Sequence, residues 1–192
     1  MIRHLVSGIA LTAIAAPGVF AQDVSTARGE LELVGRAEPA CVTRAPAAVA
    51  GVNASFDPSG DNGGEIRIAQ LVDQTTAEPV AASITLTIPV ICNASHLVTL
   101  TSLNGGLLRD TGNPLQRQSA DGFGEFLPYQ LNFAWAGQDR AASSEAARSL
   151  VFNIARGAAG DATFRFALPG GGGALLAGRY SDAVIIQFTP AN

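Results

Sequence analysis

The chain has 192 residues, of which 47% are hydrophobic and 15% are charged, and this composition predicts one globular domain with a sizeable core rather than disorder. The net charge is −4, and all 12 basic residues are arginines that lie singly along the chain. The sequence therefore has no basic patch of the kind that would indicate a nucleic-acid or anionic-membrane partner.

Residues 1–21 are predicted to be a secretory signal peptide. They begin with the basic MIRH, continue with the short apolar stretch LVSGIALTAI, and end with the small-residue signature Val19-Phe20-Ala21 before Gln22. A buried N-terminal helix is the less favoured alternative. No later stretch approaches the ~20 consecutive apolar residues of a membrane-spanning helix, so we expect residues 22–192 to be exported as one soluble domain.

The predicted export would place the two cysteines in an oxidising compartment. Cys41 and Cys92 are the only cysteines, and an even number of cysteines in an oxidising compartment predicts one disulfide between them. A metal site is the competing interpretation. It lacks ligands, because His96 is the only histidine left after cleavage and neither cysteine belongs to a C-x-x-C motif. The sequence predicts no metal ion and no other cofactor.

Apolar residues recur with a period of two after Gln22, which is typical of half-buried β-strands. In chain order these positions are Leu31 and Leu33; Ile66 and Ile68; Ile84, Leu86, Ile88 and Val90, in phase with Cys92; Leu127, Tyr129, Leu131, Phe133 and Trp135; Leu150, Phe152 and Ile154; Phe164, Phe166 and Leu168; and Val184, Ile186 and Phe188. The stretch HLVTLTSL is a further candidate strand.

Turn-forming clusters, such as DPSGDNGG, SLNGG and PGGGG, separate these segments. The stretch DRAASSEAARSL could form a short helix or a loop. About seven or eight strands tied by one bridge predict an all-β fold, an antiparallel β-sandwich.

Few side chains form a pattern that indicates chemistry. PGGGGALLAG resembles a phosphate-binding loop, but only 14 residues follow Gly178, too few for a βαβ unit. Asp57, Asp61 and Glu65 could hold calcium, although turn-forming residues explain the cluster equally well. No carboxylate pair, no nucleophile with a base and no G-x-S-x-G motif stands out, so the chain is not expected to be an enzyme.

The order of the segments resembles that of a known family. After QDVSTAR come GELELVGRAEPAC, VICNASHLVTLTSLNGGLL, LPYQLNFAW and GRYSDAVIIQFTP. The most specific matches are the spacing of Cys41 and Cys92, the pair Cys92-Asn93 leading to Asn104-Gly105-Gly106, and Gly178-x-Tyr180-x-Asp182 before an alternating strand. Across the whole mature chain this arrangement resembles the spore coat protein U family, which includes the pilins of archaic chaperone–usher pili.

The resemblance implies an immunoglobulin-like sandwich that lacks its final strand and so has a groove beside its last one. The residues implied as the acceptor groove are Tyr180, Val184, Ile186 and Phe188. A periplasmic chaperone and then the N-terminal donor segment of the next subunit would fill it, and an outer-membrane usher would secrete the head-to-tail polymer to the cell surface.

The donor segment would lie near residues 22–33, with Val24, Ala27, Leu31 and Leu33 as its apolar residues. Leu31 and Leu33 could instead form the first strand of the subunit's own fold. A second hypothesis from another class also stands: a monomeric exported binding module that pairs its last strand internally and holds a ligand such as a glycan with the PGGGG or SLNGG loops.

Overall fold

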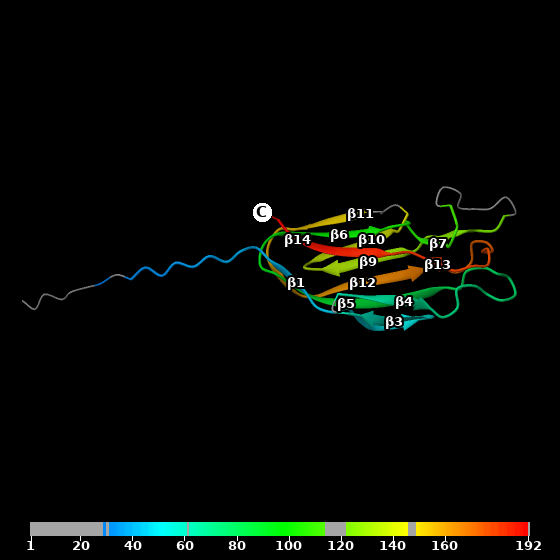
Figure 1. Cartoon of the computed structure of the whole chain (residues 1–192), viewed down its shortest axis with the longest axis horizontal. Coiled ribbons are helices and arrows are strands. Elements are labelled where there is room, and N and C mark those ends of the chain that lie inside the picture. Colours follow the sequence, from blue (N-terminus) through cyan, green and yellow to red (C-terminus); the bar gives the residue numbers. More distant parts are fainter. Residues whose placement is uncertain (1–28, 30, 61, 114–121, 146–148, 192) are drawn as a thin grey trace, which may run out of the picture. The chain divides into compact units, whose positions relative to one another are not determined.

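The structure is a computed structural model that describes residues 29, 31–60, 62–113, 122–145 and 149–191 (Figure 1). The chain divides into two units, Met1–Arg36 and Ala37–Asn192. The expected signal peptide, residues 1–21, lies outside the described residues, as do Val24 and Ala27 of the expected donor segment.

The described residues of the second unit form β-strands joined by turns and loops, and every pairing between these strands is antiparallel. The strands are β1 Cys41–Thr43, β2 Ala47–Val52, β3 Ala54–Ser59, β4 Gly63–Ile68, β5 Ala82–Cys92, β6 His96–Ser102, β7 Leu107–Arg109, β8 Phe126–Leu127, β9 Gln130–Trp135, β10 Gln138–Ser143, β11 Ser149–Ile154, β12 Ala158–Leu168, β13 Tyr180–Ser181 and β14 Val184–Pro190.

Two sheets face each other and enclose the core, so the predicted antiparallel β-sandwich is confirmed. The larger sheet has the order β1-β5-β12-β9-β10, with β2 also paired to β5, and the smaller has the order β11-β6-β14. The ring of Phe133 in β9 stacks on that of Phe152 in β11 with 4.8 Å between centroids, which joins the two layers. Figure 1 shows the smaller sheet lying over the larger one.

The alternation in the sequence determines which residues face this core. In β5 every second residue from Ala82 to Cys92 is buried, and in β9 the buried residues are Leu131, Phe133 and Trp135. Side chains of a strand alternate between its two faces, so a period of two in hydrophobicity becomes one apolar face. The predicted strands around these residues are confirmed.

Two smaller sheets flank the sandwich. One is the β3–β4 hairpin, in which Phe56 lies opposite Ile66, and the other has the order β13-β7-β8. The expected strand at Ile66 and Ile68 is therefore confirmed as β4. The sequence DPSG was expected to be a turn, but its first three residues, Asp57, Pro58 and Ser59, belong to β3.

Two expectations about secondary structure are wrong. The stretch 139–150, a possible helix or loop, instead supplies β10 and the start of β11. Ala136 and Gly137, both with positive φ (49° and 78°), form the two-residue hairpin turn that pairs β10 with β9. Leu31 and Leu33 form no strand of the subunit's own fold: among the described residues no strand precedes β1, and their side chains are 90% and 94% exposed.

Candidate binding groove

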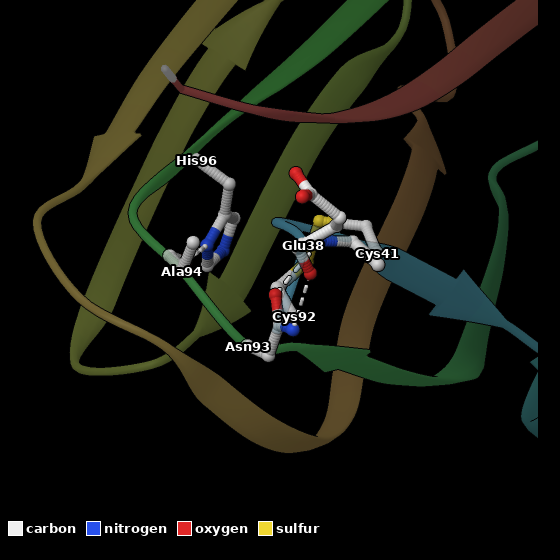
Figure 2. The surroundings of a disulfide bond; sticks show 7 residues. Glu38, Cys41, Cys92, Asn93, Ala94 and His96 are labelled. Atoms are coloured by element: carbon white, nitrogen blue, oxygen red, sulfur yellow. Dashed lines mark hydrogen bonds between the residues drawn. A yellow bond between two sulfur atoms is a disulfide. The ribbon is translucent and has the colours of Figure 1, made fainter. Parts of the chain in front are cut away.

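The predicted disulfide between Cys41 and Cys92 is present, and the two residues lie opposite each other where β1 pairs with β5 (Figure 2). The side chain of Asn93 holds the chain just before β1: its Nδ2 donates to the carbonyl of Glu38 (2.8 Å), and its Oδ1 accepts from the amide of Ala40 (2.7 Å). The chain therefore leaves the domain from a fixed point. A disulfide of this kind is typical of an exported, non-reducing environment.

His96 lies beside this bridge and is fully buried. Its Nδ1 lies 2.9 Å from the carbonyl oxygen of Ala94, and its ring lies 5.0 Å from that of Trp135. A ring nitrogen of His96 and the two sulfurs come within 4.8 Å of one another. Both sulfurs are joined in the disulfide, however, and a metal ion is bound by thiolates, so in this oxidation state the cluster is a packing arrangement.

A groove lies along β14, between the two sheets. It has a cavity volume of about 430 Å³. Its apolar lining comes from β14 (Val184, Ile186, Phe188), from β5 (Leu86, Ile88), from β12 (Phe166, Leu168) and from the β3–β4 hairpin (Phe56, Ile66, Ile68). Three of the four residues expected at an acceptor groove, those of β14, thus lie together on one wall.

The edge of β14 beside this groove is open. Among the described residues β14 pairs only with β6. Ile186 lies opposite Leu100 and Phe188 lies opposite Val98 in the same sheet. Val98 and Leu100 are 0% and 1% exposed, whereas Ile186 and Phe188 are only half-buried. The core is therefore well covered along β6 and incompletely covered along β14.

A partly buried hydrogen-bond network fixes one end of the groove. The carboxylate of Asp182 accepts hydrogen bonds from the hydroxyls of Tyr129 (2.7 Å) and Ser102, and from the amides of Asn104 (2.9 Å) and Ala183 (2.8 Å). Burial is the main reason that the pKa of Tyr129 lies well above its usual range. The network joins the turn after β6 to the residue pair before β14. It brings together Asn104 and Asp182, which are distant in the sequence, just before β14 begins.

Tyr180, the fourth residue expected in the groove, is not among the residues that line it. It lies in β13, and its hydroxyl is 2.9 Å from the carbonyl oxygen of Gly124 and 2.8 Å from that of Leu176. Burial raises its pKa as well. Tyr180 holds together the loops at the end of the sandwich.

The glycine-rich loop after β12 borders a second hollow, of about 380 Å³. Its lining includes Gly171, Gly172 and Gly173 of this loop together with Phe126 and Leu175. This hollow is the place where the loop-binding hypothesis would seat a small ligand.

The acidic residues considered for calcium are only partly described, because Asp61 lies outside the described residues. Asp57 and Glu65 lie opposite each other in the β3–β4 hairpin. Arg67 lies 3.1 Å from a carboxylate oxygen of each. An arginine thus already supplies the positive charge that a cation would bring to this pair.

Comparison with protein-family models, with curated proteins and with solved structures finds no match to this chain. In the part of the chain that the structure describes, no helix is long and apolar enough to cross a membrane. A function for this chain has to account for three features: the open groove along β14, the exposed apolar segment at residues 31–34, and the fixed point at Asn93 from which that segment leaves the domain.

Proposed function

We propose that the chain is a structural subunit of a secreted surface fibre, an immunoglobulin-like sandwich with an incomplete edge. The N-terminal segment of one copy fills the groove along β14 of the next. The observation that carries this proposal is the half-buried apolar face of β14 beside an open strand edge. An exposed edge of this kind is an aggregation hazard unless another strand covers it.

The N-terminal segment has the composition that such a groove needs. Leu31, Leu33 and Val34 are 90%, 94% and 81% exposed, so these large apolar side chains are available to another copy. Leu31 and Leu33 alternate with glutamates, so in an extended strand both leucines lie on one face. Strand addition gives affinity through main-chain hydrogen bonds and specificity through alternate side chains. Residues 22–33, with Val24 and Ala27 upstream, form the proposed donor.

Each copy would carry one donor and one acceptor, and this makes the contact head-to-tail. A contact between two different surfaces extends into a filament when its rotation does not close a ring. Before assembly the groove of each subunit needs a temporary occupant, because it exposes apolar side chains and unpaired backbone groups. A periplasmic chaperone and an outer-membrane usher are the proposed partners, with a cell-surface fibre as the product.

A tethered donor tests this proposal. Residues 22–36 are appended after β14 through a short flexible linker, so that the added strand can reverse and run antiparallel to β14. Tethering gives the added strand an effective concentration in the millimolar range. We expect the tethered chain to be monomeric with a raised Tm, whereas the untethered mature chain polymerises with increasing concentration.

The matched control carries the same linker and segment with the appended copies of Leu31 and Leu33 replaced by glutamate. It should behave like the untethered chain. If the untethered chain stays monomeric at high concentration and tethering leaves its Tm unchanged, the fibre proposal fails. The exported binding module is then the better hypothesis.

A further inference from the structure

The β3–β4 hairpin has one apolar and one charged face. Register pairs Phe56 with Ile66 and Ala54 with Ile68 on one face, and Asp57 with Glu65 on the other. All three large apolar side chains of the hairpin line the groove, and Glu65 borders it as well. Asp57, Glu65 and Arg67 are exposed and joined by ion pairs. The hairpin therefore turns its apolar face toward the groove.

Two features hold this hairpin in place. A two-stranded hairpin is only marginally stable by itself. At its base Asn53 donates from Nδ2 to the carbonyl of Gln70 (2.7 Å) and accepts at Oδ1 from the amide of Gln70 (2.9 Å). Within the hairpin, a Cβ added at Gly64 would lie 2.2 Å from Cζ of Phe56. The absence of a side chain at position 64 thus lets the Phe56 ring rest on the opposite strand, at a set position.

The groove still has room with the hairpin in place. Its volume of about 430 Å³ is many times the ~10–15 Å³ that one water molecule needs. Folded interiors have few voids larger than a single water molecule. A strand that inserts apolar side chains here would touch β14 on one side, β5 and β12 beneath, and the hairpin on another side, with Thr43, Arg44 and Pro46 also bordering the groove.

We propose that the β3–β4 hairpin is the third wall of the acceptor groove, and that Phe56, Ile66 and Ile68 contact Leu31 and Leu33 of a second copy of this chain. The inference rests on the proposed function and names the residues that retain the donor. Contacts formed after docking mainly determine the rate of dissociation. The hairpin therefore governs how long a donor stays bound.

The test measures binding of a fluorescent peptide of residues 22–36 to the full mature chain. In the chain itself Leu31 and Leu33 are replaced by glutamate, so that it accepts a donor without supplying one. Phe56→Ala should raise the dissociation rate about tenfold or more, as expected for a buried aromatic anchor, with a much smaller change in the association rate. Phe56→Leu should recover most of the residence time.

Arg67→Ala is the matched control, because it shortens a long side chain on the opposite face of the same hairpin. Its dissociation rate should stay within about twofold of the parent, since exposed ion pairs contribute little. Equal rates in Phe56→Ala and in the parent would overturn the inference and leave the fibre proposal standing. Failure of the parent to bind the peptide would overturn both.

Ile66→Thr is a second variant in case Phe56→Ala does not fold. Thermal unfolding, followed by the fluorescence of Trp135, shows whether each variant is folded. Ile66→Thr keeps the β-branched shape and places a hydroxyl on the same wall, so it too should shorten the residence time of the peptide. If the folded Ile66→Thr chain releases the peptide at the same rate as the parent, the proposal that the hairpin is the third wall of the groove is wrong.

Discussion

A charge placed on the β14 wall of the groove should prevent assembly and leave the subunit folded. Ile186 lies at the middle of β14, is half-buried and lines the groove. Its neighbour Ile185 is the same residue type on the opposite face and is 53% exposed. We expect Ile186→Asp to abolish polymerisation and Ile185→Asp to have little effect, because only the first carboxylate would be covered by a donor strand.

The size of the effect follows from the burial of Ile186. Full burial of an isoleucine side chain contributes roughly 1.5–3 kcal/mol. Ile186 is already mostly covered in the subunit, so at most about a third of this, up to ~1 kcal/mol, remains for strand addition. An unpaired carboxylate covered by the donor adds several kcal/mol of desolvation. A total of about 4 kcal/mol weakens donor binding roughly a thousandfold. In the isolated subunit the carboxylate can still reach solvent, so its cost there should be nearer ~1 kcal/mol.

Sedimentation velocity over a concentration series measures the polymerisation of both variants and of the unmodified mature chain. Thermal unfolding of the monomer confirms that each variant is folded. The reasoning is refuted if Ile186→Asp polymerises as readily as Ile185→Asp, or if both substitutions abolish polymerisation equally. In the first case the β14 wall of the groove is not covered on assembly, and in the second the outer face of β14 takes part as well.

Three further predictions concern the fold. Alkylation without reductant should modify neither Cys41 nor Cys92, and replacing both with alanine should cost about 4 kcal/mol in the chain-entropy model, given their separation of 51 residues. Chemical unfolding should show that Phe133→Ala, in the core, costs ~3–5 kcal/mol and that the outward-facing Asn132→Ala costs little; equal costs would mean a different register. The raised pKa of Tyr129 means that the folded chain holds this proton more tightly than the unfolded chain, whose value is about 10. Its stabilising contribution is complete below about pH 10 and is lost as the pH rises toward the folded-state value, so Tyr129→Phe should flatten the decline of Tm above pH 10, and an identical decline would contradict this.

Strands that bury one face could be predicted from the sequence. β5, β9 and β12 lie in the sandwich with their inward residues covered, and this requirement leaves a period of two in the sequence. β2 and β10 were not predicted, because β2 is exposed at every position and β10 is an edge strand with few covered residues. A strand without a buried face carries no alternation.

The groove was predictable only in part. The wall formed by β14 follows from the alternation of Val184, Ile186 and Phe188 together with a family resemblance. The hairpin wall was missed, because the glycine, proline and aspartate residues around Pro58 indicate a turn, although a proline is acceptable in a strand edge. Tyr180 was placed in the groove by the family resemblance, whereas its hydroxyl reaches the carbonyl of Gly124, more than fifty residues away. Pairings of this kind depend on tertiary contacts that local pattern does not contain.

In a head-to-tail fibre, the position of the disulfide would let each subunit carry tension. Tension would enter each subunit through its N-terminal segment, which joins the domain at β1, and β1 has only three residues. Hydrogen bonds of so short a strand resist little force, but the bond from Cys41 to Cys92 passes the load covalently to β5. β5 has 11 residues and pairs along its whole length with β12, and both strands line the groove that would hold the next donor. The disulfide would thus connect the N-terminal segment, where tension enters the subunit, to β5 and β12, the strands that line the groove for the next donor.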